Sequence, residues 1–390
     1  MQNSAVSMAP HETPLQPRRN TNLDALRGIA ILMVLGRHAG EGVTSAHAAN
    51  LFTFCWQRIG WAGVDLFFVL SGFLISGLLF SDFQQRGRIG LVRFYIRRGL
   101  KIWPSLYALI AVGLLAHAVG FGHTFTRAQL FSELFFLQDY FPSIWGITWS
   151  IAVEEHFYLF LPLLLVFLLR RNSARPFAAL PIIFVGIALF SLACRFLVGW
   201  KQNGTIDPFT SVFPTHLRID GLMFGVLICY LMRFRPEAFQ WFVRWWGGWA
   251  VIAVAFVLLC AVPLESRQMH TWGFTVIYLG AGFLIAKAVA HEGPRPIRFI
   301  SGLLARIGFY SYSIYLWQVF FFQILAHFHI KSPMVTYWCF IIGAVLFGIA
   351  ASKVIEIPVL HLRDRLFPGL SKPPILASPA ETPAPTVASV

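Results

Sequence analysis

The feature that most constrains this 390-residue chain is a succession of long apolar blocks joined by short polar connectors. A block of about 20 apolar residues is what an α-helix needs to cross a lipid bilayer. Only 12% of the residues are charged, about half the fraction usual in a soluble domain. So few charges do not cover a soluble globule of this size. The sequence therefore predicts an all-α polytopic membrane protein.

Ten transmembrane helices can be placed, and no internal repeat is visible. The longest connector, about 121–146, mixes apolar and polar residues and has room for a short interfacial helix. The predicted spans lie near 25–43, 61–81, 99–120, 147–169, 176–198, 212–233, 247–264, 271–290, 306–328 and 335–357.

The distribution of Lys and Arg predicts the orientation of these spans. With the N-terminus inside, 22 of the 31 Lys and Arg residues fall in inside segments and 5 in outside segments. Cytoplasmic loops carry such an excess, so we expect both termini in the cytoplasm. Residues 23–366 form the expected membrane domain. Residues 1–22, which lack the apolar core of a signal peptide, and 367–390, rich in Pro, Ala, Ser and Thr, are expected to be disordered cytoplasmic segments.

The formal charge of +14 does not indicate a nucleic-acid partner. The basic residues form short clusters between apolar blocks, whereas a nucleic-acid-binding protein presents a contiguous basic face. The five cysteines lack the spacing of metal ligands, so neither a metal site nor disulfides are expected.

Ionisable residues inside the predicted spans are the candidate functional residues, because each costs at least about 2.5–3.5 kcal/mol to insert. Arg27 and His38 lie eleven residues apart in the first span. They therefore share one helix face, roughly 16 Å apart along the axis, with the cation at the inner end. A snorkelling Arg27 paired with Asp24, and a purely structural His38, remain alternatives.

The fourth span carries Ser150, Glu154 and Tyr158 at intervals of four, hence on one face. Glu154 is predicted to lie at the depth of His38, where a carboxylate orients an imidazole; a structural clamp between helices is the alternative. Glu155 follows directly in the sequence.

Further polar groups open two other spans. Asp65 begins the second span, and Arg218 and Asp220 begin the sixth. Arg218 can pair with Asp65 or with Glu155, and the sequence does not choose between them. Small residues such as Ser71-Gly72 allow close helix packing.

Three cations, Arg97, Arg98 and Lys101, lead into the third span on the predicted cytoplasmic side. Such a cluster at the membrane edge suits an anionic ligand with several phosphates. Orientation of the span and binding of lipid headgroups are the alternative.

Together these residues resemble the acyltransferase-3 family of bacterial integral-membrane O-acyltransferases, and the match runs in order from about residue 22 to 365. The motifs that carry the resemblance are Leu23-Asp24-Ala25-Leu26-Arg27-Gly28 with His38, Gly63-Val64-Asp65-Leu66-Phe67-Phe68, the Arg97/Arg98/Lys101/Pro104 cluster, Trp149-Ser150-Ile151-Ala152-Val153-Glu154-Glu155-His156-Phe157-Tyr158, Arg218-Ile219-Asp220-Gly221, Ser311-Tyr312-Ser313-Ile314-Tyr315-Leu316-Trp317 and Glu356-Ile357-Pro358.

The resemblance implies transfer of an acyl group, usually acetyl, from cytoplasmic acyl-CoA to a hydroxyl of an extracytoplasmic carbohydrate or glycolipid, in the bacterial inner membrane. His38 is then the general base or a transient acyl carrier, assisted by Glu154. Arg27, Arg97, Arg98 and Lys101 bind the phosphates of the acyl-CoA. Two positions depart from the family, which commonly has His at Gln318 and Arg at Lys101. The hydrolase-like domain that some members append is not expected.

A transporter or flippase of a sugar or lipid-linked substrate is the main alternative, because charges also line transport paths. The partners expected in either case are membrane lipids and the carbohydrate substrate. The sequence identifies neither the acceptor glycan nor the oligomeric state.

Overall fold

The computed structural model describes residues 20–41, 51–121, 124–172, 174–202, 207–291, 295–328 and 330–368. Within these ranges every regular element is helical, which confirms the all-α prediction. Apart from residues 20–22 and 367–368, the two terminal segments predicted to be disordered lie outside the described residues.

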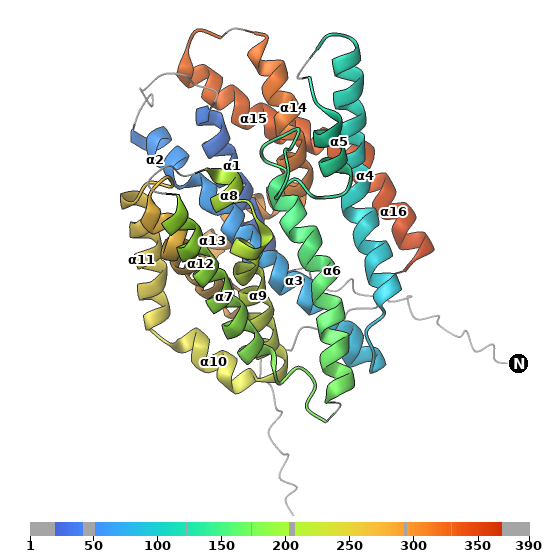
Figure 1. Cartoon of the computed structure of the whole chain (residues 1–390), viewed down its shortest axis with the longest axis vertical. Coiled ribbons are helices and arrows are strands. Elements are labelled where there is room, and N and C mark those ends of the chain that lie inside the picture. Colours follow the sequence, from blue (N-terminus) through green and yellow to red (C-terminus); the bar gives the residue numbers. More distant parts are fainter. Residues whose placement is uncertain are drawn as a thin grey trace, which may run out of the picture.

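The first half of the chain forms α1 (Thr21–Glu41), α2 (Leu51–Ile59), α3 (Gly63–Arg86), α4 (Leu91–Ala118), α5 (Arg127–Leu134), α6 (Trp149–Arg171), α7 (Leu180–Lys201) and α8 (Pro208–Ser211). The second half forms α9 (Thr215–Phe234), α10 (Pro236–Arg244), α11 (Gly247–Ala261), α12 (Phe274–Ala290), α13 (Arg295–Phe309), α14 (Ser311–Ala326), α15 (Pro333–Ala351) and α16 (Ile357–Leu366). In Figure 1 the long helices pack side by side, with α5 near the upper end of the bundle and α10 at the lower end.

Six helical segments of the described chain have the length and hydropathy of a membrane span, and a seventh is added if the bent pair α10 and α11 counts as one. Each of the ten predicted spans nonetheless overlaps a helix. The other three predicted spans, 25–43, 212–233 and 306–328, coincide with α1, α9 and α14 and are not among these segments. Helices α1 and α9 carry buried charged residues, and α14 has 16 residues. The number of ten spans therefore stays a prediction.

Helices α3 and α9 cross at very short distance because glycines lie at the contact. A Cβ atom on Gly72 would stand 1.8 Å from the carbonyl oxygen of Leu222, and one on Gly225 would stand 2.1 Å from that of Val69. Any larger residue would push the helices apart. The close packing expected from the small residues of the second span is confirmed.

The connector between α4 and α6 contains the short helix α5, which begins with a capping box. Thr126 accepts from the backbone N–H of Gln129, and the Gln129 side chain accepts from that of Thr126. In the last turn of α5, Glu133 is fully buried. One of its oxygens accepts from the backbone N–H of Ile144 at 3.1 Å and from the Thr148 hydroxyl at 2.7 Å.

Glu133 in this connector makes the stability of the folded protein depend on pH. Burial raises the pKa of Glu133 to about 7, although its hydrogen bonds oppose the shift. The folded protein thus keeps a proton here that the unfolded chain loses above its ordinary pKa of 4.5. We expect stability to be greatest below that pH and to decline by up to about 3 kcal/mol as the pH rises through 7.

Thermal unfolding of the detergent-solubilised protein at pH 5 and pH 8 measures this effect. Glu133→Gln, a neutral group of the same shape, should flatten the pH dependence that the parent protein shows between these values. An equal dependence in the variant would assign it to other groups.

Candidate active site

The first helix carries the predicted cation and base at two levels. Arg27 lies within 3.7 Å of Asp24, the i, i+3 partner that the sequence offered. Next to Arg27 in the sequence, Gly28 allows α13 to pack closely on α1, since a Cβ atom on Gly28 would meet the Leu304 carbonyl oxygen at 2.1 Å. Arg27 is thus held at the end of a tightly packed helix pair.

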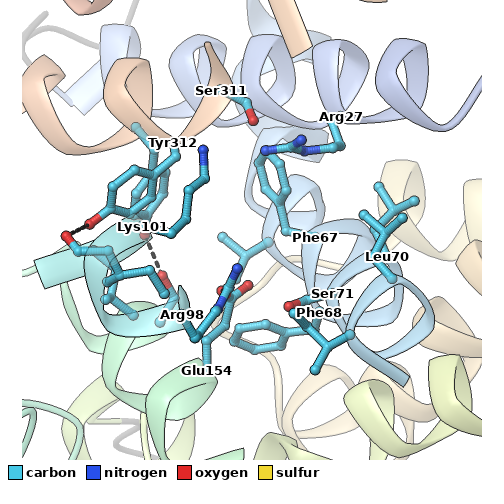
Figure 2. A pocket seen from close by; sticks show the side chains of 17 residues that line it. Arg27, Phe67, Phe68, Leu70, Ser71, Arg98, Lys101, Glu154, Ser311 and Tyr312 are labelled. Carbon is cyan, nitrogen blue, oxygen red and sulfur yellow. Dashed lines mark hydrogen bonds and ion pairs between the residues drawn. The ribbon is translucent and has the colours of Figure 1, made fainter. Parts of the chain in front are cut away.

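A cavity of about 170 Å³ opens beside Arg27, between α1, α3, α4, α6 and α14. Figure 2 shows Arg27 of α1 and Arg98 and Lys101 of α4 extending toward the same central space. One part of the wall is apolar, and the polar part consists of cations, one carboxylate and hydroxyls. The polar lining residues are Arg27, Ser71, Arg98, Lys101, Ser150, Glu154, Ser311, Tyr312 and Tyr315.

Arg98 and Glu154 form the charged centre of this cavity. The guanidinium lies 3.6 Å from the Glu154 carboxylate and 3.9 Å from the centroid of the Tyr158 ring. The Tyr158 hydroxyl donates to Glu154 at 2.5 Å and accepts from Ser71. Of the predicted face, Ser150 and Glu154 line the cavity, and Tyr158 contacts it through its hydrogen bond to Glu154.

The partner of Glu154 differs from the expected one. We expected Glu154 to orient His38, because both were placed in the outer part of the bilayer. The structure instead brings Glu154 opposite Arg98, eight residues into α4. Arg98 and Glu154 face each other across the cavity between α4 and α6, and the carboxylate is satisfied there.

The three cations of α4 have different environments. Lys101 lines the cavity and forms an ion pair with Glu356, a buried carboxylate that also accepts from Ser352 at 3.0 Å. Arg97 points elsewhere: its guanidinium contacts Asp364 at 3.0 Å and the Phe367 carbonyl oxygen. Arg97 is therefore not among the cavity-lining residues that the structure describes.

Hydroxyl groups of α14 and α6 close the cavity. Ser150 donates to the Tyr315 hydroxyl at 2.6 Å, and that hydroxyl donates to the Ile147 carbonyl oxygen at 2.6 Å. Tyr312 donates to the Ile102 carbonyl oxygen at 2.7 Å. Among the described side chains that line the cavity, the Ser311 hydroxyl and Arg98 Nε are buried without a hydrogen-bond partner. Such groups suit a polar ligand.

His38 lies beyond the cavity, three turns from Arg27. Its Nδ1 is 2.9 Å from the side-chain oxygen of Gln318. Gln318 follows Tyr315 by one turn of α14, a rise of about 4.5 Å. The cavity-lining Tyr315 and the partner of His38 are therefore close neighbours on α14, although neither Gln318 nor His38 is among the described lining residues.

The remaining predicted polar residues lie outside the cavity. Arg218 pairs with Asp65 at 2.7 Å, which decides between the two partners that the sequence allowed. Asp220 pairs with Arg195 at 2.8 Å. Glu155 accepts from the Trp103 indole at 3.1 Å.

Sequence reasoning assigned no role to several residues that build the site. Ser311, Tyr312 and Tyr315 belong to a quoted motif, and their aromatic-hydroxyl pattern inside an apolar block was the available signal. Glu356 carried a signal too, as the acidic residue of its span. No group of His, Cys, Asp and Glu in the described part of the chain has the arrangement of a metal site.

The described part of the chain is thus a helical bundle with a cavity lined by three cations. The model of the family described as "Acyltransferase domain" matches residues 20–353. The chain therefore belongs to the acyltransferase-3 family, whose model is that of an acyltransferase domain.

Curated relatives agree with this membership. The chain is 26% identical over 359 residues to "Putative O-acetyltransferase SACOL0978" of Staphylococcus aureus (strain COL), covering 86% of this chain and 56% of that protein. It is 26% identical over 393 residues to "O-acetyltransferase OatA" of Staphylococcus aureus (strain NCTC 8325 / PS 47), covering 93% and 60%. The chain thus spans little more than half the length of these relatives. No solved structure shows significant similarity.

Proposed function

We propose that this protein is a membrane O-acyltransferase that moves an acyl group, most simply acetyl, from acyl-CoA to a hydroxyl of an extracytoplasmic carbohydrate or glycolipid. The observation that carries the proposal is the cavity lined by Arg27, Arg98 and Lys101. Its lining residue Tyr315 lies three residues from Gln318, the partner of His38, on α14. The proposed path of the acyl group runs from the cationic end along α14 to His38.

The donor binds at the cationic end. Three cations and one carboxylate line the cavity, so positive groups outnumber negative ones on its wall, which favours phosphate groups. Asp24, Glu154 and Glu356 each lie beside one of these cations. The partnerless Arg98 Nε and Ser311 hydroxyl offer further hydrogen bonds. The flexible pantetheine arm then extends along the cavity and carries the thioester toward His38.

Transfer proceeds by direct attack of the acceptor hydroxyl. Its oxygen bonds to the thioester carbonyl carbon while the proton passes to His38. Collapse of the tetrahedral intermediate breaks the carbon–sulfur bond, and the proton finally protonates the leaving thiolate. Every atom is accounted for, and no metal is required. Glu154 assists by positioning Arg98.

The other polar residues hold this arrangement together. Ser71 and Tyr158 fix the Glu154 carboxylate, and Ser150 fixes Tyr315. Asp65, Glu155, Arg218 and Asp220 keep the helices around the cavity in register through their buried pairs.

The proposed topology has ten spans within a membrane domain of residues 23–366, both termini in the cytoplasm, and the bacterial inner membrane as location. Its support is the excess of Lys and Arg in the inside segments. The cationic end of the cavity then faces the cytoplasm, where acyl-CoA is found. His38 lies toward the other side, where the acceptor arrives.

The test is transfer of radiolabel from acetyl-CoA to candidate glycans by the purified protein, comparing Arg27→Gln with Arg97→Gln. Removing a charge-assisted contact costs about 1.5–3 kcal/mol, so Arg27→Gln should raise the KM for acetyl-CoA at least tenfold. Arg97 lies outside the cavity, so its replacement should change KM far less. Equal effects of the two changes would place the donor elsewhere, and transport of the intact glycan without label would favour a transporter.

A further inference from the structure

Gln318 contacts the candidate base on one side and its own helix on the other. Its side chain is 1% exposed. The amide nitrogen donates to the Tyr315 carbonyl oxygen at 3.0 Å, and the amide oxygen lies 2.9 Å from His38 Nδ1. The opposite amide orientation would set oxygen against the carbonyl oxygen, so these two contacts together determine which end faces the histidine.

This orientation determines the tautomer of His38. An amide oxygen only accepts hydrogen bonds, so the hydrogen between the two side chains belongs to His38 Nδ1. A neutral imidazole carries a hydrogen on only one of its two ring nitrogens. Its other nitrogen, Nε2, is then the unprotonated one.

We propose that Gln318 is a positioning residue that holds His38 in the Nδ1–H form, so that Nε2 receives the proton of the acceptor hydroxyl. The inference rests on the proposed function, since it gives a direction to the base named there. The same logic operates in catalytic triads, where a group hydrogen-bonded to one ring nitrogen orients the ring and leaves the other to act as base.

The surroundings hold His38 in place for this role. The Tyr337 hydroxyl donates to the Gly36 carbonyl oxygen at 3.2 Å, and the Trp56 indole donates to that of Leu32 at 3.0 Å. These two hydrogen bonds fasten the two turns of α1 that precede His38 to α2 and α15. Because the backbone is held there, the hydrogen bond to Gln318 determines the orientation of the imidazole ring.

Two substitutions at position 318 separate positioning from packing. Gln318→Leu fills similar space without an acceptor, whereas Gln318→Glu in its protonated form keeps an oxygen opposite Nδ1 and a donor toward the Tyr315 carbonyl oxygen. A hydrogen bond of this kind contributes about 0.5–1.5 kcal/mol. We expect Gln318→Leu to lower kcat up to about tenfold with an unchanged KM for acetyl-CoA, and Gln318→Glu to retain most of the activity.

The same assay includes His38→Ala and a thermal unfolding measurement of each variant. A folded Gln318→Leu protein with full kcat, while His38→Ala is inactive, overturns the role of Gln318 alone. Full activity of His38→Ala overturns the base in the proposed function. Equal loss in Gln318→Leu and Gln318→Glu, with both proteins folded, shows that the acceptor oxygen is not what matters and also overturns the inference.

Discussion

Replacing His38 with alanine should reduce label transfer from acetyl-CoA by at least about 100-fold, because a general base contributes typically 10²–10⁴-fold to a rate. The loss should appear in kcat. Binding of the donor depends on Arg27, three turns away on α1, and on Arg98 and Lys101 of α4. The KM for acetyl-CoA should therefore stay near its original value. Steady-state kinetics on the purified protein measure both quantities.

A second histidine serves as the matched control. His117 lies exposed at the end of α4, and His117→Ala should retain the activity of the parent protein. If His38→Ala kept full activity, the direct-attack route through this residue would be wrong. If the label instead accumulated on the protein in the absence of acceptor and His38→Ala abolished that label, His38 would be the acyl carrier.

Helix periodicity predicted Arg27, His38 and the Ser150–Glu154–Tyr158 face correctly as features of single helices. A span of given spacing presents the same face wherever it packs, so such statements survive folding. The spacing within one helix does not show which face of another helix it contacts. Glu154 lies opposite Arg98 because α4 and α6 line the same cavity, and the local sequence of neither helix specifies that contact.

For the same reason, the sequence does not show which of Arg97 and Arg98 enters the cavity. They are adjacent in sequence and chemically identical, yet they lie about 100° apart around the helix. One enters the cavity and the other meets α16. A sequence shows that a cationic cluster exists, whereas the assignment of each member requires the packing of distant helices. Gln318 illustrates the converse, since it was noted only as a missing histidine.

Breaking the ion pair of Asp65 with Arg218 should have the largest effect on stability. Both residues are 3% exposed, and the guanidinium also lies 3.8 Å from the centroid of the Phe274 ring. Removing one partner of a buried pair costs about 3–5 kcal/mol, because the other charge stays buried without compensation. We therefore expect Asp65→Ala to lower the thermal unfolding temperature strongly, with loss of folded protein in detergent.

The double variant Asp65→Leu/Arg218→Met distinguishes a structural pair from a substrate contact. It removes both charges and leaves apolar groups, and such replacements of buried pairs are often neutral or stabilising. It should therefore recover most of the unfolding temperature that Asp65→Ala loses. Recovered stability with transfer activity retained would assign the pair to the fold, as its position outside the cavity implies. Recovered stability with no transfer would contradict that position and give the pair a part in binding the acceptor.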